Sequence, residues 1–258
     1  MGVVNVTPDS FSDGGKSPSA ELAIKTARRL LEDGADILDI GGESTRPGAM
    51  PVSLDEELSR VIPVIDALAG EGACVSVDTR NASVMSAAIV AGATIINDIT
   101  ALEGDEKSLS VIADSQASVV LMHMRGDPQS MQDAPVYNDV VAEVGAYLLT
   151  RMRACEQAGI GKERIAIDPG IGFGKTLDHN LELLRNLSAF TGLECPLVLG
   201  VSRKNFIGRL SGENVPNRRL AGSLAAGLAG VARGATILRV HDVLETRQAL
   251  DVWQALKS

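Results

Sequence analysis

Aromatic residues and basic charge are both scarce in this chain of 258 residues. Phe, Trp and Tyr together make up 3% of it, and 24 Lys and Arg stand against 33 Asp and Glu, for a formal net charge of −9. A nucleic-acid surface needs a basic stripe and stacking rings, so we expect no nucleic-acid partner. No apolar run approaches the ~20 residues of a membrane span, so we expect no membrane partner.

Cysteine is also rare. The three cysteines, Cys74, Cys155 and Cys195, are odd in number and far apart, which excludes a disulfide framework and a Cys-x-x-Cys metal site. No low-complexity stretch or Pro/Ser-rich linker divides the sequence, and Met1 leads directly into an apolar segment rather than a signal peptide. We therefore expect one domain over residues 1–258 and a cytoplasmic location.

What recurs is an alternation of short apolar runs with amphipathic segments. Eight runs rich in Val and Ile predict strands at 2–6, 37–41, 74–78, 94–98, 119–124, 164–168, 196–202 and 236–241. Their continuous hydrophobicity is typical of a parallel sheet that is covered on both faces. Helical patterns lie at 19–33, 53–69, 138–157, 178–189, 217–233 and 242–256. Eight strands alternating with helices predict an α/β fold, a single (β/α)8 TIM barrel, with an open doubly wound sheet as the alternative.

Polar residues gather where these apolar runs end. They are Asn5, Asp39, Asp78, Asn97, Asp98, His123, Asp168, Ser202, Arg203, Lys204, Arg239 and His241. In a barrel the carboxyl ends of all strands meet at one rim, where active sites of this fold lie. The set therefore predicts an active site. Capping of the following helix stays open as an alternative for Asp39 and Asp98.

The charges at this rim indicate the ligand. Arg46, Arg203, Lys204, Arg239 and His241 form a cationic cluster suited to a phosphate or diphosphate. Asn5 offers the kind of neutral oxygen that Mg²⁺ takes beside substrate phosphates. Asp78, Asn97 and Asp168 suit a planar group such as a pterin or guanine, because a carboxylate accepts two parallel N–H bonds.

Motifs for other chemistries are incomplete. The segment GIGFGKT at 170–176 is not a Walker A loop, which would require glycine at the position of Pro169. The three histidines form no His-Glu-x-x-His pair, and the sequence has no Gly-x-Ser-x-Gly elbow.

Two long N-terminal motifs resemble the signatures of dihydropteroate synthases. They are MGVVNVTPDSFSDGG at 1–15 and GADILDIGGESTRPG at 34–48. Shorter motifs of that family follow in the same order: SVDT at 76–79, NDI at 97–99, MHM at 122–124, DPGIGFG at 168–174, SRK at 202–204 and RVH at 239–241. The resemblance covers essentially the whole chain.

This resemblance implies a homodimeric TIM barrel of folate biosynthesis. Its reaction joins 6-hydroxymethyl-7,8-dihydropterin diphosphate to p-aminobenzoate and releases diphosphate, with Mg²⁺ as cofactor. It assigns pterin binding to Asp78, Asn97, Asp168 and Lys204, the metal to Asn5, and diphosphate to Arg46, Arg239 and His241. The expected p-aminobenzoate pocket comprises Phe11, Thr45, Pro47, Phe173 and Asn205. The expected catalytic groups are Asp78, Lys204, Arg239 and His241.

The sequence departs from the family pattern at three places. Asn205 replaces the usual serine after SRK, although its amide can still donate to a carboxylate. Arg125 replaces a common glutamine after MHM. The first strand opens the chain, whereas family members generally carry a leader, a difference that we expect to bear on stability rather than chemistry.

Three other functions stay open. A pterin-binding domain of a corrinoid-dependent methyltransferase shares the Asp-Asn-Asp contacts but has no use for a diphosphate cluster. A non-catalytic pterin-binding paralogue would be expected to lose Lys204, Arg239 or His241. A Schiff-base aldolase would use Lys204 as its nucleophile.

Overall fold

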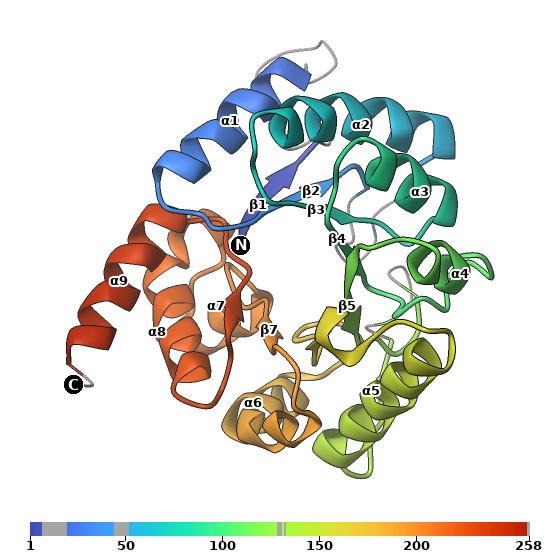
Figure 1. Ribbon diagram of the computed structural model, residues 1–258. Helices are drawn as coiled ribbons and strands as arrows, with labels where there is room; N and C mark the ends of the chain where they lie inside the picture. The colour runs from blue at the N-terminus through green and yellow to red at the C-terminus, as the bar shows by residue number, and fades with distance from the viewer. Residues whose placement is uncertain (7–19, 44–51, 128–130, 132, 257–258) are drawn as a thin grey trace.

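The fold is a ring of parallel strands enclosed by helices (Figure 1). The computed structural model describes residues 1–6, 20–43, 52–127, 131 and 133–256. The strands are β1 (Gly2–Asn5), β2 (Leu38–Gly41), β3 (Val75–Asp78), β4 (Ile95–Asp98), β5 (Ser118–Met122), β6 (Ile165–Asp168), β7 (Val198–Leu199) and β8 (Ile237–Leu238). Each of these strands overlaps the segment in which the sequence predicts a strand.

Backbone pairing joins all eight strands into a closed barrel. Strands β1 to β6 pair in parallel in chain order, and β7 pairs in parallel with β8. Single parallel bridges, Ile167 with Leu197 and Gly2 with Val240, connect these two sheets. At the closing seam the amide of Val3 donates to the carbonyl of Val240 over 3.0 Å. The predicted (β/α)8 barrel is confirmed.

The helices pack their apolar sides on the strands. They are α1 (Ala20–Glu32), α2 (Leu54–Gly70), α3 (Ala82–Val90), α4 (Ser108–Ala113), α5 (Val140–Gln157), α6 (Leu177–Arg185), α7 (Asn205–Ser211), α8 (Leu220–Val231) and α9 (Val243–Ala255). The described part of the chain also contains 3₁₀ helices at Lys162–Arg164, Leu187–Leu193 and Pro216–Arg218. None of the helices in the described ranges is long and apolar enough to cross a membrane.

Helix boundaries show where local sequence signals succeed and fail. Ser53 caps α2 by accepting the amide of Glu56 over 3.3 Å. Ser53 with Glu56 three residues later is the sequence pattern of a capping box, but only this half forms, because the Glu56 carboxylate pairs with Arg60. The pattern expected at 178–189 splits into α6 and a 3₁₀ turn. Helix α3 was not expected, since its sequence ASVMSAAIV is small and apolar all round and has no helical period.

Candidate active site

Four residues at the carboxyl ends of neighbouring strands form one layer across the barrel. Strand register places Asn5 beside Gly41, Gly41 beside Asp78, and Asp78 beside Asn97. A Cβ at Gly41 would lie 3.8 Å from Asn5 Oδ1 and 3.9 Å from Asp78 Oδ2. The layer therefore brings an amide oxygen and a carboxylate oxygen to the two sides of Gly41.

Beneath this layer an arginine joins two buried carboxylates. Arg239, which follows β8, donates from Nε to Asp39 Oδ2 over 2.6 Å and from Nη2 to Asp78 Oδ2 over 2.7 Å. Burial alone would lower the pKa of Arg239, but Asp39 and Asp78 raise it, so it stays a cation. Burial raises the pKa of Asp78, a rise that Arg239 opposes and Asp39 increases.

Asp39 does not cap a helix, which the sequence had left open as an alternative. It lies inside β2, two residues before Gly41 and on the same inward face, with no exposed surface. Besides Arg239 it accepts bonds from Ser76 Oγ over 2.6 Å and from Asn97 Nδ2 over 3.1 Å. Asp39 is thus the buried anchor of the layer above it rather than a cap.

Across the barrel, Asp168 and Lys204 form the second part of the site. Asp168 ends β6 and accepts the amide of Gly170 over 2.7 Å. Lys204 Nζ lies 4.0 Å from the centre of the Phe173 ring, a cation–π contact. Burial raises the pKa of Asp168 and lowers that of Lys204 to about 8, and each group opposes the shift of the other.

Two residues of the predicted rim, Asp98 and Arg203, serve local structure instead. Asp98 accepts bonds from both the amide and the hydroxyl of Thr100, each over 2.7 Å, and so caps the turn after β4. Arg203 has a left-handed backbone (φ 60°), and its Nε donates to Asp242 Oδ2 over 3.0 Å. Arg203 of the predicted cationic cluster thus pairs with Asp242, just as Arg239 pairs with Asp39 and Asp78.

The two rim histidines have different surroundings. His241 Nδ1 lies 3.0 Å from Ser202 Oγ, which ties the chain after β8 to the chain after β7. His123 is buried, and its Nδ1 lies 2.9 Å from the Nζ of Lys175. Burial, with Lys175 adding to the effect, lowers the pKa of His123 to about 3, so this ring stays neutral.

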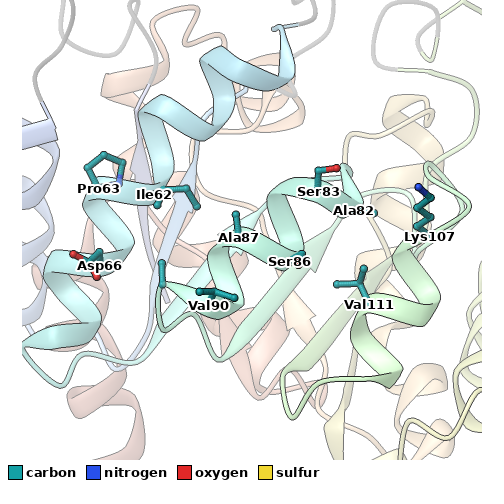
Figure 2. Close-up of a pocket in the computed structure, with 11 residues that line it drawn as sticks. Ile62, Pro63, Asp66, Ala82, Ser83, Ser86, Ala87, Val90, Lys107 and Val111 are labelled. Atoms are coloured by element: carbon teal, nitrogen blue, oxygen red, sulfur yellow. The ribbon is translucent and has the colours of Figure 1, made fainter.

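A groove on the outside of the barrel is a separate feature. It has a volume of about 820 Å³ and lies between α2, α3 and α4 (Figure 2). Its walls are mostly small and apolar, with Ile62, Ala87 and Val90 among them, and it contains none of the predicted site residues. We therefore assign the candidate site to the strand ends and not to this groove.

Comparison with known proteins identifies the family. Residues 1–241 match the pterin binding enzyme family. A dihydropteroate synthase of Escherichia coli strain K12 is 49% identical over 259 residues, covering 100% of this chain and 91% of that protein. The chain belongs to the dihydropteroate synthases.

Solved structures of dihydropteroate synthases, which are transferases, have the same fold as this chain. Xanthomonas albilineans dihydropteroate synthase with 4-aminobenzoic acid matches at a TM-score of 0.95 and 52% identity, covering 100% of this chain and 92% of that one. The same enzyme in complex with 7,8-dihydropteroate matches at 0.91 and 49% identity, covering 100% and 93%. Both similarities extend over the whole of this chain.

Several expected site residues of this dihydropteroate synthase cannot be placed. Phe11, Thr45, Arg46 and Pro47 lie outside the described residues. Asn205 begins α7 and is exposed.

Sequence reasoning missed four polar residues that support the site. These are Ser76, which binds Asp39, and Lys175, Asn180 and Tyr137, which hold the loop after β6. Ser76 sits inside an apolar strand, and an interior polar residue of that kind is the signal that could have found it.

Proposed function

We propose that this chain joins 6-hydroxymethyl-7,8-dihydropterin diphosphate to p-aminobenzoate, giving 7,8-dihydropteroate and diphosphate. The observation that carries this proposal is the pairing of the Asn5–Asp78–Asn97 layer with Asp168 and Lys204 at one rim of a dihydropteroate synthase barrel. The layer supplies acceptors for a polar heterocycle, and the cations suit an anionic leaving group.

The pterin would lie between Asp168 and Asn97. Asp168 keeps Oδ1 on the amide of Gly170, and its carboxylate can accept the parallel N–H bonds of the 2-amino and N3–H edge. Asn97 and Asp78 offer amide and carboxylate groups from the neighbouring strands. Lys204 would cover the ring, since its ammonium lies beside Phe173 and its side chain is half-buried.

Asn5 fits the magnesium expected from the family. No group of three or more His, Cys, Asp or Glu side chains able to hold a metal occurs among the described residues. Mg²⁺ does not require one, because it commonly takes one or two protein oxygens beside substrate phosphates and water. Asn5 Oδ1, which lies beside Gly41 and near the Asp78 carboxylate, would supply such an oxygen. When bound, the metal would neutralise charge on the diphosphate.

Cleavage of the C–O bond to diphosphate is the demanding step. We propose a dissociative, SN1-like route, in which the bonding pair leaves with diphosphate and a cation delocalises into the pterin. Arg239 and His241, with Arg46, would stabilise the departing anion. The Asp78 carboxylate, held by Arg239, would stabilise the pterin cation. The neutral arylamine then forms the C–N bond and loses its proton to solvent.

The arylamine pocket would include Phe173 and Asn205, with Phe11, Thr45 and Pro47. Phe173 presents its ring beside Lys204, and a benzoate ring can stack on such a face. Asn205 is exposed at the start of α7, where its amide can reach a carboxylate. The homodimer and the cytoplasmic location stay predictions.

Diphosphate release tests the proposal directly. Purified protein, Mg²⁺ and the pterin diphosphate are incubated with and without p-aminobenzoate, and diphosphate and dihydropteroate are measured. We expect release that depends on p-aminobenzoate, with one dihydropteroate formed per diphosphate. Tight pterin binding without release would instead favour the non-catalytic or methyltransferase alternative.

We expect the pKa of Lys204 to set the alkaline limit of synthase activity. Its pKa is lowered from the ordinary 10.5 to about 8, so its ammonium is present below pH 8 and is lost as the pH rises through that value. We expect kcat/KM to fall above about pH 8 for this reason. A Lys204→Arg variant keeps a cation at all accessible pH values and should lose this alkaline limb, whatever its absolute rate. An unchanged limb in the variant would contradict the assignment to Lys204.

A further inference from the structure

Lys175 is a buried lysine, 2% exposed. Among the described residues no carboxylate lies within ion-pair distance of it, and Asp168 acts on it at longer range, opposing the lowering of its pKa by burial. Its Nζ instead lies 2.9 Å from His123 Nδ1, 2.9 Å from the carbonyl of Phe173 and 3.2 Å from that of His123. Burial lowers the pKa of Lys175 to about 7, and in its ammonium form its three donors match these three acceptors. Burying a lysine in this way is costly, so its position calls for a reason.

These bonds fasten the loop after β6 to the chain after β5. The loop covers residues 169–176 and passes so close to its neighbour that a Cβ at Gly170 or Gly174 would collide with the carbonyls of His123 and Arg125. Both glycines also have positive φ, which other residues rarely adopt. The two glycines therefore allow the loop backbone to lie directly against the chain after β5. Lys175 links the two segments, because its Nζ bonds to the carbonyls of both Phe173 and His123.

Two further side chains hold the same loop. Asn180 Oδ1 accepts the amide of Gly172 over 2.6 Å, and the hydroxyl of Tyr137 donates to the carbonyl of Gly174 over 2.9 Å. Of these three side chains, Lys175 is the one that binds the carbonyl of Phe173, the residue whose ring lies against Lys204. The position of this ring thus depends on the Lys175 contact more directly than on the other two.

We propose that Lys175 is a positioning residue for the arylamine substrate, because it fixes the Phe173 backbone and so the ring on which p-aminobenzoate packs. It does not touch substrate itself. The low pKa of His123 supports this arrangement, since a neutral imidazole keeps Nδ1 free to accept a bond from Lys175. The inference rests on the proposed function, which assigns Phe173 to the p-aminobenzoate pocket.

The test separates KM from kcat. Lys175→Met keeps the length of the side chain and removes its donors, and we expect the KM for p-aminobenzoate to rise about tenfold with kcat nearly unchanged. Pterin affinity, measured by calorimetry, should also stay nearly unchanged, because β6 holds Asp168. Lys162→Met is the matched control, since Lys162 pairs with Glu194 at the surface, and it should behave as wild type.

A second variant covers the case in which Lys175→Met does not fold. Tyr137→Phe keeps the ring and removes only the bond to Gly174, so we expect a smaller rise in the same KM, about threefold. An unchanged KM in folded Lys175→Met, or a fall in kcat alone, would overturn the inference, as would an unchanged KM in Tyr137→Phe if Lys175→Met is unfolded. Wild-type protein without synthase activity would overturn the proposed function and this inference together.

Discussion

An Arg239→Met variant is expected to lose both stability and synthase activity. In the folded protein Arg239 bonds to Asp39 and Asp78, and its side chain is only 22% exposed. Removing it leaves two carboxylates close together without a cation, and breaking a buried ion pair in this way costs about 3–5 kcal/mol. The diphosphate also loses a cation at the moment it leaves, which we expect to lower kcat about 10³-fold. Urea unfolding and diphosphate release measure the two losses.

A second substitution separates the two roles of Arg239. Asp39→Asn removes one buried charge and keeps an oxygen that can accept from Ser76, so adding it to Arg239→Met should recover much of the lost stability. Activity should not recover, because the cation is still missing. Recovered activity in the double variant would contradict the diphosphate role, and full stability of the single variant would contradict the structural bridge. The Asp39→Asn single variant is the control.

The sequence predicted the parts of the site that depend on strand ends. Asp78, Asn97 and Asp168 each close an apolar run, and parallel strands bring such ends to one rim. The bond between Arg239 and Asp39 could not be predicted in the same way. It joins residues 200 positions apart and forms only because the barrel closes between β8 and β1.

Local sequence patterns also gave wrong expectations for two cations whose bonding partners are set by tertiary contacts. Arg203 follows a strand like its neighbour Lys204, but its left-handed backbone directs it to Asp242. Lys175 belongs to a segment that resembles a phosphate loop, yet the structure places it in the interior beside His123. In both cases the residue type correctly indicated a cation. Its bonding partner, however, belongs to another segment of the chain, which the local sequence does not specify.

Asp168→Asn is expected to remove most of the pterin affinity. The substitution keeps an oxygen for the amide of Gly170, so the loop after β6 should hold its shape. It replaces a carboxylate, which accepts two parallel N–H bonds, with an amide that offers one acceptor and one donor. Losing charge-assisted bonds of this kind costs about 3 kcal/mol, or about 100-fold in Kd. Calorimetry with the pterin in the absence of p-aminobenzoate measures this loss without requiring turnover.

Asp98→Asn provides the matched control, because Asp98 also ends a strand and is also buried, yet its oxygens bind Thr100 and the amide of Leu102. It should lower the free energy of unfolding by about 1–2 kcal/mol and leave the pterin Kd within about twofold of wild type. If both variants weakened pterin binding equally, the loss would reflect a general disturbance of the strand ends. If Asp168→Asn kept wild-type affinity, the pterin would have to bind through other groups. A large effect in Asp168→Asn alone would show that, of these two buried strand-end carboxylates, only Asp168 recognises the pterin.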